Sequence, residues 1–209
     1  NPKGFRHNEQ SLRVADVLEN DGAGLNLTYE VRDGILEHKK TGHPHTLEGK
    51  VVSLSDRISY LNHDIDDAIR AGIFSEDDLP REEVRLLGKT NKERINNMIL
   101  SVWRESDGKN DVRMENEFRE ATENLRKFMF DRVYNDLAAQ KEEARANEMI
   151  SVMYEHYKSK IDLLPDFYRS LLDRFDVDTV VSDYISGMTD RYAVYTFEEI
   201  YVPKNFLLR

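Results

Sequence analysis

Apolar residues recur with helical spacing from Thr46 to Gly72, the longest clearly periodic stretch in the first half of the chain. At about 100° per residue, one stripe collects the apolar side chains Leu54, Ile58, Leu61, Ile65, Ala68 and Ile69. The opposite side carries Asp56, Tyr60, His63, Asp64 and Asp67. Arg57 is the only basic residue near that side, although surface helices usually mix acids with bases. The pattern predicts a long amphipathic helix whose polar side is either a solvated surface or the wall of a site that receives a cation.

The same spacing predicts further helices, and strand-like alternation is scarce. The first helices are expected over 8–18 and 28–38, with Val31 facing inward in the second. A short helix enters at Pro80 and closes at Gly88. Thr90 and Glu93 form a capping box that opens the next helix, with Ile95, Met98, Ile99 and Val102 as its inward residues. The remaining predicted helices cover 114–136, 138–160, 166–174 and 178–192.

Composition supports a single helical domain. The 209 residues are 39% hydrophobic and 33% charged, with only 5 Pro and 10 Gly, which is typical of an all-α protein rather than a sandwich or barrel. There is no Cys, so disulfides and thiolate chemistry are excluded. A cytoplasmic location is the simplest expectation, because the sequence shows neither a membrane-length apolar run nor a signal peptide. The net charge of -10 argues against nucleic acid as a major partner.

His7 and Glu9 lie together in FRHNEQS, where a loop meets the first predicted helix. A histidine in this place is commonly an ordinary surface residue. Imidazole also titrates near neutral pH, so His7 is a candidate general acid or base, and a nearby carboxylate could fix its tautomer. Glu9 could equally be an acid favoured by the helix macrodipole. Both readings stay open on the sequence alone.

Asp56 follows the apolar segment VVSLS, so we expect it to be buried with a partner, either a metal ion or an arginine. His63 and Asp64 are adjacent and point about 100° apart, which disfavours joint ligation of one metal. The loop residues His43 and His45, with Glu48, form a weak metal-like cluster whose simpler reading is solvation. Walker loops, dinucleotide fingerprints, nucleophile elbows and Glu-x-x-His pairs are absent from the sequence.

Five segments together resemble the bacterial deoxyguanosine triphosphate triphosphohydrolases of the HD superfamily. They are FRHNEQS, LTYEVRDGILEH, TLEGKVVSLSDRISYLNHDIDDAIRAG, LRKFMFDRVY and DYISGMTDRYA, in the family's order along the chain. The resemblance implies an HD-domain-like multi-helix bundle, with 1–73 as the remainder of a catalytic core and 74–209 as a C-terminal helical region. It also implies metal-dependent cleavage of a deoxynucleoside triphosphate to deoxynucleoside and tripolyphosphate.

The resemblance assigns roles to particular residues. His7 matches the family's catalytic histidine and Glu9 a supporting carboxylate, while Asp56 matches one ligand of a divalent metal ion, Mg²⁺ or Mn²⁺. The substrate-binding residues would be Arg57 at the phosphates, Tyr60 at the nucleotide pocket and Asp64 at the sugar 3′-hydroxyl.

The family's other metal ligands, a His and a His-Asp pair, belong before FRHNEQS, and the chain offers no match to them. We therefore expect the chain to be the C-terminal part of a longer enzyme, to bind the metal poorly and to be inactive alone. The alternative is a catalytically inactive module that senses nucleotides or supports oligomerisation. The resemblance further implies a homo-oligomer.

Overall fold

The computed structural model describes residues 4–134 and 137–204, in which all regular secondary structure is helical and no strand occurs. The predicted all-α class is confirmed. Contacts divide the chain into two compact units, one of residues 26–140 and one of residues 1–25 with 141–209. This division does not coincide with the functional division predicted at residue 73, which stays a prediction. None of the described helices is long and apolar enough to cross a membrane.

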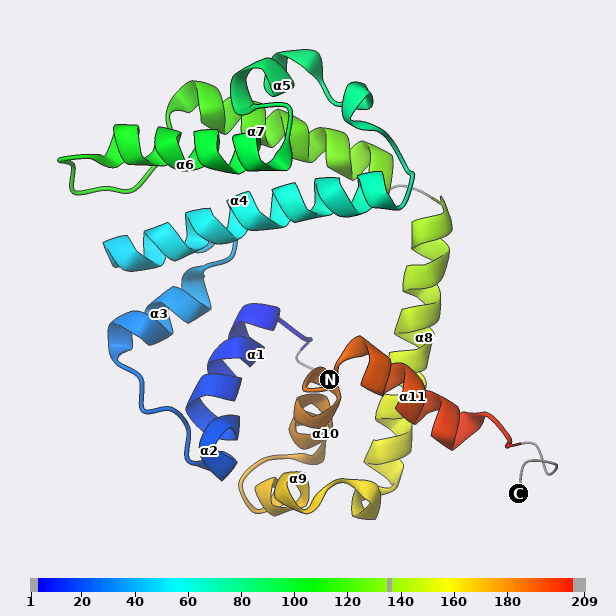
Figure 1. The fold of residues 1–209 in the computed structure, drawn as a ribbon. Helices are drawn as coiled ribbons and strands as arrows, with labels where there is room; N and C mark the ends of the chain where they lie inside the picture. The colour runs from blue at the N-terminus through cyan, green and yellow to red at the C-terminus, as the bar shows by residue number, and fades with distance from the viewer. Residues whose placement is uncertain (1–3, 135–136, 205–209) are drawn as a thin grey trace. The chain divides into compact units, whose positions relative to one another are not determined.

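The unit of residues 26–140 is built around a long central helix, and Figure 1 shows its first helix in light blue and its other helices in cyan and green. Its helices are α3 (Tyr29–Glu37), α4 (Leu47–Arg70), α5 (Arg81–Leu87), α6 (Asn91–Ser106) and α7 (Asn116–Met129). Short turns are η2 (Glu76–Asp78) and the π-helical η3 (Phe130–Tyr134). Helix α4 packs against α3, α6 and α7, and α5 packs against α6 and α7. One hydrophobic core results.

Helix α4 confirms the predicted amphipathic helix. Thr46 caps its start, with the side-chain oxygen accepting a hydrogen bond from the Gly49 amide at 3.0 Å. The apolar stripe is buried as expected, with Ile65 fully covered. The other buried members are Ile58, Leu61 and Ala68, while Leu54 and Ile69 are half-buried. One face of α4 is therefore buried in the core, and the residues on the opposite face are not part of that core.

Helices α3 and α4 approach each other through glycine. A Cβ placed on Gly34 would lie 3.6 Å from the Cα of Gly49. The prediction that Val31 faces inward is wrong, because its side chain is 49% exposed. Asp33 and Gly34 are the buried residues of α3 instead. Because this nine-residue helix packs through a glycine, its small and polar positions turn inward, so Val31 falls outside the contact while Ile35 is half-buried.

Gly88 and the capping box that follows it set the start of α6. Gly88 has φ of +118°, which a side chain rarely tolerates, and it ends α5 as predicted. Thr90 and Glu93 form the predicted capping box. Ile99 is 53% exposed, so its predicted inward position is wrong, whereas the adjacent Met98, also predicted to face inward, is fully buried. A rotation of one residue, about 100°, separates the two positions.

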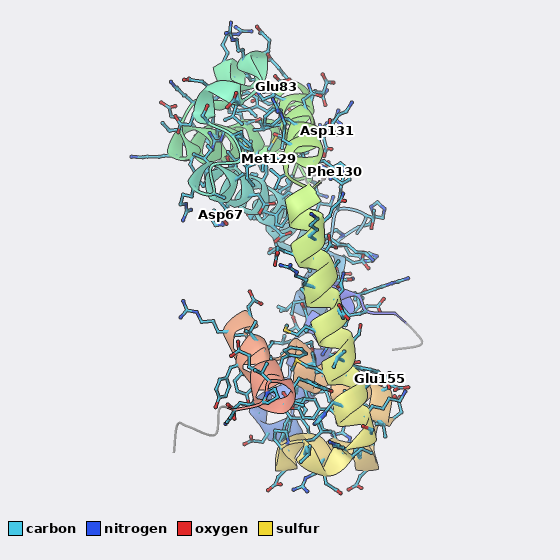
Figure 2. The ribbon with its side chains drawn as sticks, turned by 90° about the vertical axis from the view of Figure 1, so that its right-hand side faces the viewer. Asp67, Glu83, Met129, Phe130, Asp131 and Glu155 are labelled. Atoms are coloured by element: carbon cyan, nitrogen blue, oxygen red, sulfur yellow. The ribbon has the colours of Figure 1, made fainter. Side chains whose placement is uncertain are left out.

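Helix α7 ends earlier than the predicted helix over 114–136, and residues 135 and 136 lie outside the described part of the chain. Met129 is the last residue of α7 and is buried, whereas Phe130 begins the wide turn η3 and is 54% exposed. Figure 2 labels both residues. The core packs against every apolar position predicted for this segment: Phe118, Ala121, Leu125, Phe128, Met129 and Val133.

The second unit joins the N-terminal segment to the C-terminal helices. Its elements are α1 (His7–Arg13), the π-helical turn η1 (Val14–Leu18), the single turn α2 (Glu19–Gly22), most of α8 (Leu137–Ser159), η4 (Ile161–Leu163), α9 (Asp166–Ser170), η5 (Leu171–Asp173), α10 (Val177–Ser186) and α11 (Asp190–Tyr201). The predicted single helix over 178–192 is two helices. Gly187 ends α10, and Thr189 caps α11 by accepting from the Tyr192 amide.

The core of this unit lies among α8, α10 and the short helices between them. Its buried members are Met153, Tyr157, Leu164, Leu171, Val180, Val181, Tyr184 and Ile185. Leu18, at the end of the N-terminal helical segment, packs against them. Tyr184 makes edge-to-face contacts with Tyr157 and Tyr168, with ring centroids 5.0 Å apart in each pair. The N-terminal segment is thus part of a core otherwise built from the last third of the chain.

Candidate functional site

The polar side of α4 carries Asp56, Tyr60 and Asp64 at intervals of four residues, so they follow one another along one face. Tyr60 is 58% exposed, Asp56 is exposed and Asp64 is half-buried. The prediction that Asp56 is buried is wrong. Two residues further on, the side chain of Ile58 enters the core; at 100° per residue Asp56 therefore points to the opposite side of the helix.

Arg57 lies against its own helix. Its Nε donates to the Ser53 carbonyl oxygen at 3.0 Å, and Nη2 is 3.5 Å from the Ser53 hydroxyl. That hydroxyl donates to the His38 carbonyl oxygen at 2.8 Å, so a buried serine ties the segment before α4 to the helix. Arg57 as a whole is exposed, and its guanidinium lies toward Ser53, one turn earlier on α4.

His7 and Glu9 lie on α1, in the other unit. Both are exposed, and the Ser11 hydroxyl donates to the His7 carbonyl oxygen at 2.8 Å. Glu9 pairs with Arg6 at 3.1 Å, a contact between two exposed side chains. Four of the predicted site residues therefore share α4, and two share α1.

No three His, Cys, Asp or Glu side chains come together as a metal site anywhere in 4–134 or 137–204. The loop cluster of His43, His45 and Glu48 is accordingly not one. His45 instead binds Asp33 of α3. Its backbone amide and its ring Nδ1 each lie 2.8 Å from a carboxylate oxygen of Asp33. These hydrogen bonds, the backbone one first, lower the pKa of Asp33 below its usual range.

A buried arginine joins α4 to α6, and the sequence analysis missed it. Arg94 is 1% exposed; its Nε donates to the Asn62 side-chain oxygen at 2.9 Å and its Nη1 to the Lys89 carbonyl oxygen at 2.7 Å. Asp66 lies 3.6 Å from Nη2 and bonds the side chain of Asn91. Burial lowers the pKa of Arg94, and Asp66 opposes that shift. Asn62 within the apolar stripe could have indicated this network, since a buried amide needs partners.

A second missed network joins α1 to α10. Asp183 is fully buried, and its carboxylate accepts from Arg13 and from Gln10. The distances are 2.8 Å and 3.0 Å from Arg13 Nε to the two oxygens, 2.7 Å from Arg13 Nη2, and 2.9 Å from Gln10 Nε2. A single carboxylate inside the apolar run VVSDYI was the pattern that could have indicated it, because such a group requires a cationic or hydrogen-bonding partner.

Residues 112–199 match the family model described as a phosphohydrolase-associated domain. A protein of Caldanaerobacter subterraneus subsp. tengcongensis named "Deoxyguanosinetriphosphate triphosphohydrolase-like protein" is 46% identical over 200 residues, covering 96% of this chain and 59% of that protein. Proteins of the same name from Clostridium perfringens strain 13 and Clostridium tetani are 42% and 40% identical. The chain is a homologue of this triphosphohydrolase-like family. The predicted resemblance is confirmed.

The match to the family extends over nearly all of this chain but over only part of each relative. The two clostridial alignments cover 97% of the chain, and 62% and 61% of those proteins. The chain thus spans about three fifths of the length of the relatives it matches. Both units contribute to the alignment, because it covers nearly the whole chain.

Proposed function

We propose that this chain is part of a metal-dependent enzyme that hydrolyses a deoxynucleoside triphosphate, with dGTP as the first substrate to test. Water would attack the α-phosphorus while the bond from that phosphorus to the 5′-oxygen breaks, giving deoxynucleoside and inorganic tripolyphosphate. The names of the relatives support the reaction class. The observation that carries the proposal is the row on α4, in which Asp56, Tyr60 and the half-buried Asp64 lie along one helix face.

The row has the length that such a substrate requires. Eight residues of helix span about 12 Å, so one face can reach from a triphosphate to the sugar. Asp64 would accept a hydrogen bond from the sugar 3′-hydroxyl, and the ring of Tyr60 would line the nucleotide pocket. Arg57 would place its guanidinium against phosphate oxygens, where a planar fork of donors binds best. His7 would give a proton to the departing 5′-oxygen, which is too basic to leave unprotonated.

A metal ion, which the family resemblance implies, would polarise the phosphoryl oxygens. Asp56 offers it one carboxylate oxygen, a ligand suited to Mg²⁺ or Mn²⁺. The residues at hand do not complete such a site, because no group of three ligating side chains occurs in the described ranges. We therefore expect the 209-residue chain alone to bind these ions weakly and to turn over little substrate.

The test uses the natural gene product at its encoded length, assayed with dGTP and Mn²⁺ or Mg²⁺. We expect deoxyguanosine and tripolyphosphate to appear in equal amounts, measured by chromatography and phosphorus NMR. Replacing His7 by Ala removes the proton donor and should lower kcat about 1,000-fold. Replacing Asp56 by Ala removes a metal ligand and should leave no measurable turnover.

Asp67→Ala is the matched control for this experiment. Asp67, labelled in Figure 2, is an exposed carboxylate on α4 that pairs with Arg70 at 3.2 Å and has no assigned role. Its removal should leave kcat within about twofold, since exposed ion pairs contribute little. Full activity in His7→Ala and Asp56→Ala would contradict the assignment of these two residues, and release of pyrophosphate or single phosphate would contradict the reaction.

The second candidate function is a module that binds nucleotides or supports oligomerisation without hydrolysis. The lack of a clustered metal site in the described residues favours it for the chain by itself. Calorimetry of the 209-residue chain with dGTP and Mn²⁺ separates the two. Binding without turnover, in a gene product that is also inactive, would support the sensing module. Assembly as a homo-oligomer stays a prediction under either function.

A further inference from the structure

Helix α1 cannot keep its orientation by helix propensity alone. Its seven residues continue directly into the five-residue π-helical turn η1, and isolated helices shorter than about 12–15 residues are marginal in water. Its first residue, His7, is exposed, and the N-cap Arg6 makes no capping hydrogen bond with its side chain. Any function that needs His7 in a fixed direction must therefore draw on contacts elsewhere along the helix.

The buried carboxylate of Asp183 supplies those contacts. Arg13 binds it with both Nε and Nη2, and Gln10 donates to it and to the Ser186 hydroxyl, at 2.9 Å and 3.1 Å. The Arg13 guanidinium also lies over the Phe175 ring, 4.1 Å from its centroid. The ion pair is thus shielded on one side by an aromatic face and closed on another by a hydroxyl.

The geometry of this anchor fixes rotation as well as position. Gln10 and Arg13 are three residues apart, so they lie within about 60° of each other around the helix, and His7 is a further 60° away. A bidentate arginine–carboxylate pair restricts both distance and angle. Gln10 and Arg13, on successive turns of α1, both donate to the buried carboxylate of Asp183. These contacts therefore set the direction in which the His7 side chain points.

We propose that Asp183, with Arg13 and Gln10, is a positioning residue for His7: the buried carboxylate holds α1 at one rotation on α10 so that the imidazole is directed for proton transfer. The catalytic part of this inference rests on the proposed function. The anchoring part stands on the contacts alone and has a readout that does not need activity.

The central variant is Asp183→Asn, which keeps the shape of the side chain and removes its charge. Asp178→Asn is the matched control, because Asp178 lies on the same helix and pairs instead with Lys158 and Tyr154 of α8, each at 2.6 Å. Hydrogen exchange is measured on the 209-residue chain. We expect exchange of the backbone amides of residues 10–13 to rise at least about tenfold in Asp183→Asn only, since that variant alone releases α1.

The kinetic readout uses the natural gene product with dGTP and Mn²⁺. Asp183→Asn should lower kcat about 100-fold with KM nearly unchanged, because a displaced proton donor affects the transition state rather than substrate binding. Asp178→Asn should leave both constants near their wild-type values. If both variants lower kcat equally, Asp183 acts through general stability and the proposal is overturned.

Gln10→Ala is the milder variant, in case Asp183→Asn does not fold. It removes one donor and leaves the ion pair, so exchange of residues 10–13 should still rise, and kcat should fall about tenfold. Unchanged exchange in residues 10–13 in the folded variants would overturn the anchoring. A wild-type enzyme without triphosphohydrolase activity would contradict the proposed function and with it the catalytic part, while the exchange result would still decide whether Asp183 orients α1.

Discussion

At the scale of single residues, polar groups inside apolar surroundings have specific partners. Asp183 binds Arg13, Asn62 binds Arg94, and Asp33 binds His45. Each partner comes from a different helix or loop, so each pair ties two segments together. The residues with predicted functional roles behave differently: Asp56, Arg57, Tyr60 and His7 are all exposed. The polar groups that join segments of this fold are thus buried, whereas these four residues are not.

The pair of Asp33 and His45 predicts a particular dependence of stability on pH. Hydrogen bonds from His45 lower the folded-state pKa of Asp33, so the stabilisation is complete above the unfolded pKa of about 3.9 and is lost as pH falls through the folded value. Asp33→Asn should lower the free energy of unfolding by about 2 kcal/mol at pH 7, because an amide cannot accept both hydrogen bonds. The difference from wild type should shrink below about pH 4.

Urea unfolding followed by circular dichroism at pH 7, 5 and 3 measures this effect. Asp77→Asn is the control, since Asp77 is a highly exposed carboxylate 3.7 Å from Lys89, and it should change the unfolding free energy by less than about 0.5 kcal/mol. A loss in Asp33→Asn that is the same at pH 3 as at pH 7 would show that the carboxylate charge is not responsible.

At the scale of helices, close approach depends on which residue lacks a side chain. Helices α3 and α4 meet at Gly34 and Gly49, yet the two positions differ in the space around them. A Cβ on Gly49 would come within 2.7 Å of the Pro44 Cβ and 3.1 Å of the Thr46 Oγ1 that caps α4. A Cβ on Gly34 would meet only an ordinary contact at 3.6 Å. The cap and the helix crossing are therefore coupled at Gly49.

This difference predicts opposite outcomes for one chemical change. Gly49→Ala should lower the free energy of unfolding by about 2 kcal/mol, since the Pro44 ring and the Thr46 cap must both move. Gly34→Ala should be neutral or stabilise by up to about 1 kcal/mol, because alanine favours the helix and the site has room. Thermal and urea unfolding of the two variants compare them directly. Equal destabilisation by both substitutions would mean that the contact between α3 and α4 has no room for a methyl group at either glycine, so that the Thr46 cap is not the cause.

At the scale of the molecule, each compact unit has its own core. The core of residues 26–140 contains Leu125 at 0% exposure, and the core of the other unit contains Met153 at 0%. No residue belongs to both clusters among those the structure describes. Each unit can therefore be weakened separately by a substitution in its own core.

Leu125→Ala should lower the free energy of unfolding of the 26–140 unit by about 3 kcal/mol, from lost burial and the cavity left behind. Hydrogen exchange should quicken in α4, α6 and α7, with less change in α10 and α11. Met153→Ala serves as the reciprocal variant and should reverse that pattern. If either substitution quickens exchange equally in both units, the two cores unfold as one.

The sequence by itself determined the helices and the family. Apolar spacing located α4, including its buried stripe, and the capping box located the start of α6, because both depend on residues close in the chain. Five segments taken together, from FRHNEQS to DYISGMTDRYA, were sufficient to indicate the homologous proteins. Periodicity predicted burial less reliably for two adjacent apolar residues. Of Met98 and Ile99, only Met98 is buried.

Only the tertiary structure decided which polar residues are buried and what they bind. Asp56 was expected inside and is exposed, whereas Asp183 lies fully buried against Arg13, about 170 residues away in sequence. Local pattern does not contain such pairings, since the partner of a buried charge is set by helix packing between distant segments. Asp56, the carboxylate that the sequence indicated, is exposed, and Asp183, which it did not indicate, binds the helix that carries His7.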